Sequence, residues 1–284
     1  MIFKNAIAYI TRKKNRTLII FIVLVLILSS LYSCLSIMGL NNSVEKNLYK
    51  LSNSAISVTL KSEQNFKTDQ FKYINNIKGI DEKYFQYDGV GKLLNHKVIE
   101  SEQGISRDDV PADLKNLVSI CAFNNMKKNN LFSSGVFTIK SGRNIEVEDT
   151  NKVIIHEELA SKNGLKLGDK IKLKLENNEE EFEIVGLFSG KKQEKFSGMS
   201  SDFSENMIFM NYNYSQKVLK NFDDNKKVAT KLYIYLVSPE KMNDVINEIK
   251  KANLEWESYK IGTDNNNFDE VRETVGSVKY IVMI

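Results

Sequence analysis

The sequence predicts an α+β protein in which one N-terminal transmembrane helix, extended by a stalk, precedes a two-lobed extracytoplasmic domain. Three observations lead to this fold class: a long apolar run at residues 18–40, two strand–helix–strand patterns far apart in the chain, and a strand-rich stretch between them. The two patterns are expected to pair into one split βαβ-type lobe. The stretch between them then forms an inserted β-rich lobe.

The apolar run at residues 18–40 contains no Asp, Glu, Lys or Arg. About 20 such residues in a helix cross the hydrocarbon core of a bilayer, so we expect a transmembrane helix in contact with membrane lipid. The first acidic residue of the chain is Glu45, and five basic residues precede the run: Lys4, Arg12, Lys13, Lys14 and Arg16. Short basic flanks stay in the cytoplasm. We therefore expect residues 1–17 to form a cytoplasmic amphipathic and basic segment, and the main domain to lie outside the cell membrane.

A cleaved signal peptide and a lipoprotein are the alternatives to a retained helix. Ser29, Ser30 and Ser33 could supply a cleavage site, and residues 31–34 loosely resemble a lipoprotein box. Both are disfavoured because the run exceeds the roughly 7–15 apolar residues of a signal peptide. The bulky Tyr32 also lies two residues before the only cysteine of that box.

Composition excludes some partners and bonds. The net charge is +4, and because five basic residues lie in the first sixteen, the remainder of the chain is close to neutral. We therefore expect no nucleic-acid partner. Of the 2 cysteines, Cys34 lies in the membrane run and Cys121 beyond it, so no intramolecular disulfide is expected.

Beyond residue 40, apolar residues recur in steps of three and four among polar ones, which predicts an amphipathic stalk helix over residues 41–54. Alternating and helical patterns then follow each other twice. A strand, a helix and a strand are expected at residues 55–60, 68–79 and 83–94, and again at residues 231–237, from Pro239 onward, and at residues 254–261. We assign residues 55–115 and 226–265 to a membrane-near lobe.

Residues 116–225 are assigned to the inserted distal lobe. Strands are expected at residues 117–123, 136–139, 153–155, 170–175, 181–188 and 207–210, and helices at residues 157–163 and 215–222. Residues 189–206 are polar and read as an exposed loop. At the end of the chain, residues 266–284 have valines at helical spacing and a closing apolar run, which predicts a second stalk and the start of a second transmembrane helix. A helix docked on the outer domain is the alternative.

Residues that often form metal, phosphate or catalytic sites are present, but their spacing does not match any motif for such a site. His96 and His156 lack a metal-ligand pattern and are expected at the surface. Residues 264–268 resemble a calcium loop but lack its glycine and its final glutamate. Residues 88–92 lack the spacing of a phosphate-binding loop and are read as a turn, and Cys121 is read as a small core residue. We predict no catalytic, cofactor-binding or metal site, and no enzyme activity.

A family resemblance is carried by residues 141–190. In order along the chain they show a Gly-Arg turn, an apolar strand, a helix ending in glycine, a Gly-Asp pair and an Ile-Val-Gly strand: Gly142-Arg143, Val153-Ile154-Ile155, Gly164, Gly168-Asp169 and Ile184-Val185-Gly186. This order resembles the extracytoplasmic core domain of MacB-type ABC-transporter permeases, within the MacB/FtsX superfamily.

The resemblance implies a role in membrane transport and no catalytic site in this chain. It implies the membrane-spanning permease subunit of an ABC transporter, coupling ATP hydrolysis by a separate cytoplasmic ATPase subunit to export or to extracytoplasmic mechanical work. It also implies a homodimer, or a heterodimer with another permease. An anchored extracytoplasmic binding or sensor protein without an ATPase is the alternative.

Overall fold

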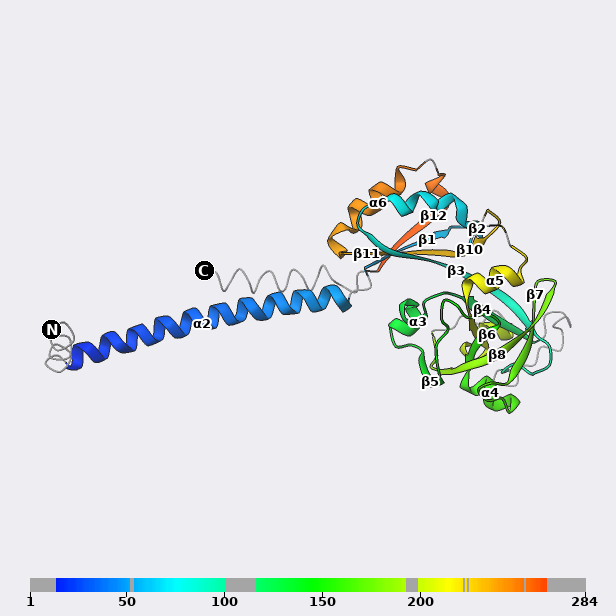
Figure 1. Ribbon diagram of the computed structural model, residues 1–284, viewed down its shortest axis with the longest axis horizontal. Helices are drawn as coiled ribbons and strands as arrows, with labels where there is room; N and C mark the ends of the chain where they lie inside the picture. Colours follow the sequence, from blue (N-terminus) through cyan, green and yellow to red (C-terminus); the bar gives the residue numbers. More distant parts are fainter. Residues whose placement is uncertain are drawn as a thin grey trace. The chain divides into compact units, whose positions relative to one another are not determined.

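Figure 1 shows the computed structural model of the chain, which describes residues 14–51, 54–100, 116–192, 199–221, 223, 225–252 and 254–264. The chain divides into two units, Met1–Ser52 with Asn265–Ile284 and Asn53–Asp264, and each is described by itself. Most of the predicted cytoplasmic segment and all of the predicted second stalk lie outside the described residues.

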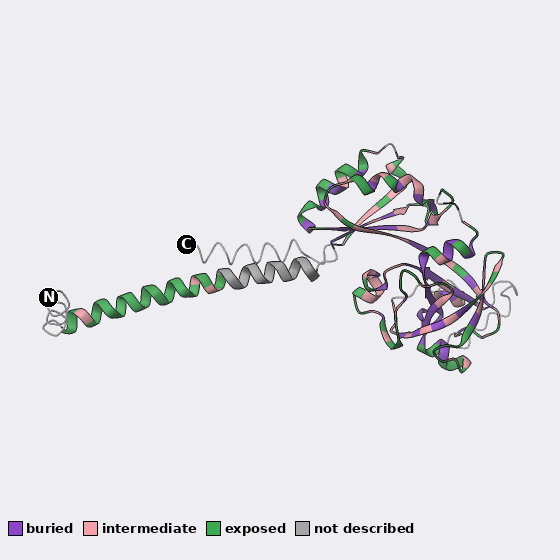
Figure 2. Cartoon of the chain, in the orientation of Figure 1, coloured by how far each residue is buried: buried purple, intermediate pink, exposed green. Residues whose placement is uncertain are grey.

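Helix α2 (Lys14–Leu51) accounts for the described part of the first unit and runs without interruption for 38 residues. The helix predicted to continue past residue 40 does so, because no proline interrupts it and one glycine at position 39 costs only about 1 kcal/mol. Its side chains are described for residues 14–37, and nearly all of them are exposed (Figure 2).

The second unit begins with an antiparallel sheet. Its strands follow the order β12-β1-β11-β3, with bounds Tyr259–Asp264, Ala55–Leu60, Lys231–Leu236 and Ile80–Leu93. The two distant strand–helix–strand patterns therefore share one sheet, as the sequence predicts, and their strands alternate in it. The helices η1 (Thr68–Asn76) and α6 (Met242–Lys250) cover one face (Figure 1). Ile56 and Val58 of β1 are fully buried against them.

A closed ring of strands forms the rest of this unit. The ring runs β3-β4-β9-β6-β8-β7 and returns to β3, with β4 (Leu117–Ala122), β9 (Met207–Met210), β6 (Lys152–His156), β8 (Asn178–Ser189) and β7 (Lys170–Leu175). Ring closure leaves these strands no free edge. Strand β5 (Thr138–Gly142) pairs with β8 outside the ring.

Strand β3 belongs to both parts. Residues 80–86 pair with β11, and residues 87–93 pair with β4 and β7. The strand expected at residues 83–94 is confirmed, but residues 88–92, also read as a turn, are the interior of that strand. The turn prediction was wrong because Gly91 serves packing and not a turn: a Cβ there would lie 2.8 Å from Leu175 Cδ2.

Short elements complete the unit. They are β2 (Phe66–Lys67), η3 (Met126–Lys128), α3 (Asn130–Ser133), α4 (Glu157–Asn163), η4 (Ser200–Asp202), η5 (Ser204–Asn206), α5 (Tyr212–Val218), β10 (Val228–Ala229), η6 (Pro239–Lys241) and η7 (Trp256–Ser258). The bounds of α4, β7 and β9 agree with the sequence prediction. Helix α5 begins earlier than predicted, because Asn211 caps it by accepting a hydrogen bond from the Tyr214 backbone N–H.

Two further expectations are corrected. The last strand, expected from residue 254, begins at Tyr259, because residues Trp256–Ser258 form a 3₁₀ turn in which the Trp256 indole donates to Ala252 O. The exposed loop expected at residues 189–206 contains buried residues in its described part. Asn206 is fully buried, and its amide pairs with both the N–H and the C=O of Ile99 at 2.8 Å.

Candidate functional site

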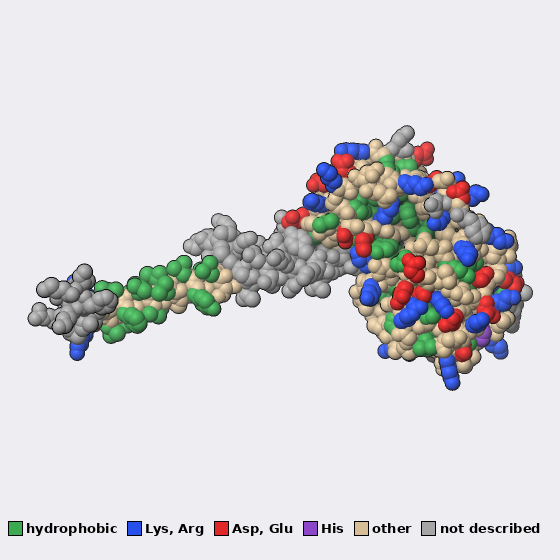
Figure 3. Space-filling view, viewed as in Figure 1, with side chains coloured by type: hydrophobic (Ala, Val, Ile, Leu, Met, Phe, Trp, Pro, Cys, Tyr) green, Lys and Arg blue, Asp and Glu red, His purple; other side chains and the backbone are tan. Residues whose placement is uncertain are grey.

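The described part of α2 presents apolar side chains all around the helix. Figure 3 shows these hydrophobic side chains along its surface, and Leu18, Phe21 and Leu26 are each about 60% exposed. By length and composition, Lys14–Ile37 could cross a membrane. The hydroxyls of Ser29 and Ser33 donate to carbonyls of their own helix, which suits a medium without water.

The chain enters and leaves the second unit at neighbouring strands. Strand β1 lies between β11 and β12, and its first residue, Ala55, is the register partner of Asp264, the last residue of β12. The helix α2 ends at Leu51, four residues before Ala55.

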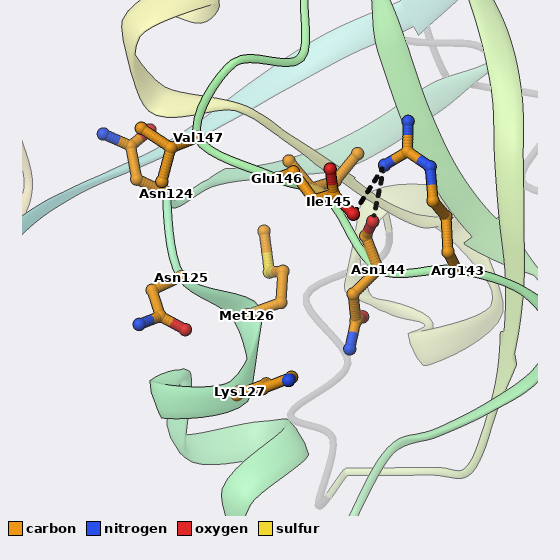
Figure 4. Close-up of a pocket in the computed structure, with 9 residues that line it drawn as sticks. All are labelled: Asn124, Asn125, Met126, Lys127, Arg143, Asn144, Ile145, Glu146 and Val147. Atoms are coloured by element: carbon orange, nitrogen blue, oxygen red, sulfur yellow. Dashed lines mark hydrogen bonds and ion pairs between the residues drawn. The ribbon is translucent and has the colours of Figure 1, made fainter.

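A hollow of about 570 Å³ lies between two short segments, residues 124–127 and residues 143–147 (Figure 4). The first segment joins β4 to α3, and the second follows β5. Asn211 holds the second segment, because its amide nitrogen donates to the carbonyls of Glu146 (2.9 Å) and Val147 (2.8 Å). Asn124 anchors the first by accepting from the Tyr212 backbone N–H at 2.9 Å.

Arg143 at the border of this hollow is bound to Asp149 by two hydrogen bonds of 2.7 Å. Burial tends to raise the pKa of Asp149, but the hydrogen bonds from Arg143 and from the Glu146 backbone, with the Arg143 and Lys152 charges, lower it overall. The hydrogen bond to Asp149 raises the pKa of Arg143. The Arg143 side chain therefore stabilises the conformation of the loop formed by residues 143–149.

The glycines of the family pattern have structural roles. Gly142, with φ of +74°, turns the chain into the Arg143 loop, and Gly186 lies so close to it that a Cβ would meet Arg143 O at 2.2 Å. Gly164 closes α4 in the left-handed conformation. Gly142 and Gly186 thus allow β5, β8 and the Arg143 loop to approach each other closely.

The histidines only partly follow the sequence prediction. His156 is buried, not at the surface: Nδ1 accepts from the Glu158 backbone N–H at 3.1 Å, and Nε2 lies 3.1 Å from Gly190 O. It caps α4, a role that spacing alone could not reveal. His96 is half-buried. Cys121 is a core residue as predicted, and burial raises the pKa of its thiol well above the usual value. Among the described residues no cluster of metal-ligating side chains occurs.

A family model described as the MacB-like periplasmic core domain matches residues 21–252 of this chain. The chain belongs to the MacB-like periplasmic core domain family. The resemblance carried by residues 141–190 is thereby confirmed. Family membership and the apolar helix α2 together indicate a membrane protein with an extracytoplasmic domain of the ABC transporter permease type.

Relatives of this MacB-like periplasmic core domain include the uncharacterized ABC transporter permease YclI of Bacillus subtilis (strain 168), 26% identical over 151 residues. The match covers 49% of this chain and 30% of YclI, so the chain spans less than a third of that relative. The extracellular domain of the noncanonic ABC-type transporter YknZ from Gram-positive bacteria aligns with a TM-score of 0.45 and 10% identity, covering 73% of this chain and 99% of that domain. The periplasmic region of MacB from Actinobacillus actinomycetemcomitans aligns with a TM-score of 0.45 and 10% identity, covering 80% of this chain and 95% of that region.

Proposed function

We propose that this chain is the N-terminal part of a membrane-spanning permease subunit. Its N-terminus lies in the cytoplasm, α2 crosses the cell membrane, and the second unit lies outside. A separate cytoplasmic ATPase subunit moves it, and the movement drives export or mechanical work outside the cell. A second permease copy or a related permease completes a dimer. This assignment extends the family's permease-type domain to a whole transporter.

The observation that supports the proposal most directly is the continuity of α2. One unbroken helix of 38 residues leads from the apolar segment to within four residues of β1. A helix without a proline hinge transmits displacement along its axis. Strand β1 is bonded on both sides, to β11 and β12. It is therefore an interior strand, and a force applied to it would be transmitted to both neighbouring strands.

The register of the same sheet also indicates where the chain leaves the second unit. We propose that residues 266–284 form a second stalk that begins directly after β12. Since Ala55 and Asp264 are register partners, the two stalks would then join the domain side by side. A relative movement of the stalks would shear β1 against β12. Within this arrangement we assign residues 55–115 and 226–265 to the membrane-near lobe and residues 116–225 to the distal lobe, with residues 87–93 of β3 extending from the first lobe into the ring of the second.

The test uses the full-length permease with its ATPase in detergent micelles and needs no known substrate. Hydrogen exchange of β1 and β12 is measured by mass spectrometry with and without ATP. We expect ATP to change exchange in both strands in the parent protein and in the control variant Ser43→Ala. Ser43→Pro breaks the helix within α2. It should retain ATP hydrolysis and lose the exchange response.

Two results would count against the proposal. An unchanged ATP response in Ser43→Pro, with the protein inserted and the helix shown to be broken, would exclude coupling through a rigid stalk. No ATP response in the parent protein, together with no association with an ATPase, would favour the anchored binding protein instead.

A further inference from the structure

The hollow between residues 124–127 and 143–147 has no part in the coupling just proposed. Its volume of about 570 Å³ is within the range of small-ligand sites, roughly 300–1,000 Å³. A single water takes up about 30 Å³ and a bare small anion not much more, so the hollow has room for a larger group. The question is which of its polar groups remain available.

Several lining groups are already engaged within the protein. Arg143 is held by Asp149 through both of its terminal nitrogens. Asn125 donates through Nδ2 to the Tyr84 hydroxyl at 3.1 Å. Asn124 uses its Oδ1 for the Tyr212 backbone N–H. These three residues fix the walls and contribute little free hydrogen-bonding capacity.

Two side chains remain, one from each segment. Lys127 is exposed and makes no ion pair within the described part of the chain. The side chain of Asn144 makes no hydrogen bond there: its Oδ1 is buried without a partner, and its Nδ2 donates to nothing. Figure 4 shows both side chains extending into the space between the segments. The hollow thus offers an ammonium and an amide N–H group as donors, beside an amide oxygen that lacks a donor of its own.

The remaining lining residues limit the ligand class. Met126 and Ile145 are buried and form apolar walls, and Val147 at the rim is 52% exposed. No aromatic side chain is among the residues that line the hollow in the described structure, so it has no stacking surface for a sugar ring. The Glu146 side chain, 70% exposed, disfavours a multiply charged anion such as phosphate.

We propose that this hollow binds a carboxylate-bearing segment of an extended polypeptide. The carboxylate accepts from Lys127 Nζ, and a backbone carbonyl of the same segment accepts from Asn144 Nδ2. A small apolar side chain packs on Met126 and Ile145. Capture of a peptide carboxylate by converging donors is a known mode of peptide recognition. The site is independent of the ATPase, since binding requires only this domain in its folded state.

Fluorescence anisotropy of labelled peptides with the full chain in detergent micelles tests the proposal. The probes are N-terminally labelled Gly-Gly-Ala-Ala-Ala with a free carboxylate, its C-terminal carboxamide, and a carboxamide form with one internal Asp. We expect saturable binding of a carboxylate form and a roughly tenfold weaker binding of the plain carboxamide. The two charged probes distinguish a chain terminus from an acidic side chain as the source.

Variants connect binding to the two donors. Lys127→Ala should remove the preference for the carboxylate, whereas Lys140→Ala, a matched exposed lysine on β5, should leave it unchanged. Asn144→Asp should weaken binding more than Asn144→Ala, because it adds a negative charge beside the ligand. The absence of saturable binding, equal affinity in Lys127→Ala and the parent, or equal competition by acetate at the peptide concentration would overturn the proposal.

Discussion

Ala55 and Asp264 are register partners in the antiparallel pair of β1 and β12, so the first residue of one strand lies opposite the last residue of the other. The chain's entry to and exit from the folded unit Asn53–Asp264 are thereby fixed at one end of one sheet. The orientation of the unit is testable separately, because the direction in which α2 crosses the membrane determines on which side the residues after Ala55 lie.

We first predict the topology. In a Cys34→Ser background, Ser161→Cys on the exposed side of α4 should react with a membrane-impermeant maleimide in intact cells, and Asn15→Cys should react only after permeabilisation. Native Cys121 is 2% exposed and supplies a low background. Labelling of Ser161→Cys only after lysis would reverse the proposed orientation.

A second prediction concerns the close approach of β8 to the Arg143 loop. Gly186→Ala should destabilise the domain by about 3 kcal/mol, because its Cβ would collide with backbone atoms that cannot move separately. The control is Gly164→Ala, which has open space and φ of +66° and should cost only about 1 kcal/mol. Thermal unfolding of the purified chain in detergent compares the two, and equal losses would contradict the assigned role of Gly186.

The Arg143–Asp149 pair predicts a pH dependence. The pKa of Asp149 is lower in the folded than in the unfolded protein, so its stabilisation is complete above the unfolded value of about 3.9 and is lost as pH falls through the folded pKa. Because Arg143 is 42% exposed, we expect only about 1 kcal/mol. The difference in melting temperature between the parent and Asp149→Asn should be constant above pH 5 and shrink below pH 4. A difference that does not change across this range would contradict the assignment.

The buried cap of α4 predicts a graded series at position 156. His156→Leu removes the acceptor for the Glu158 N–H and the partner of Gly190 O, and should cost about 2 kcal/mol. His156→Asn retains a good N-cap acceptor and should cost about half as much. Melting temperatures measured at pH 7.5, with and without EDTA, check both points. A shift caused by EDTA alone would instead indicate a metal at this position.

Local patterns were sufficient to predict much of this fold. The membrane helix, the paired strand–helix–strand units and β7, β9 and α4 each carry their signal within a few residues, as alternation, helical spacing or a terminal glycine. The interior of β3 gave a mixed signal: residues 83–94 are expected to form a strand, but residues 88–92 are also read as a turn, because Gly89 and Gly91 are typical of turns when read alone. Gly89 leaves room for the side chain of Tyr87, two residues earlier in the same strand, and Gly91 leaves room for Ile120 and Leu175, which only the closed ring brings beside it.

The candidate site could not be predicted from the sequence, because its residues come together only in the folded domain. Lys127 and Asn144 are separated in the chain by α3 and β5, and nothing in either segment indicates the other. The burial of Asn206 depends on Ile99, more than one hundred residues away in the chain. Such pairings follow from topology, and the sequence contains no periodicity that encodes them.

Strand β3 also has a consequence for the cooperativity of unfolding. Residues 80–86 pair with β11, and residues 87–93 of the same strand pair with β4 and β7 in the ring. Restricting a residue to one backbone conformation costs roughly 1–2 kcal/mol of entropy, and a strand held at one end already restricts the residues that follow it. The sheet and the ring therefore stabilise each other through β3, and we expect them to unfold as one cooperative transition.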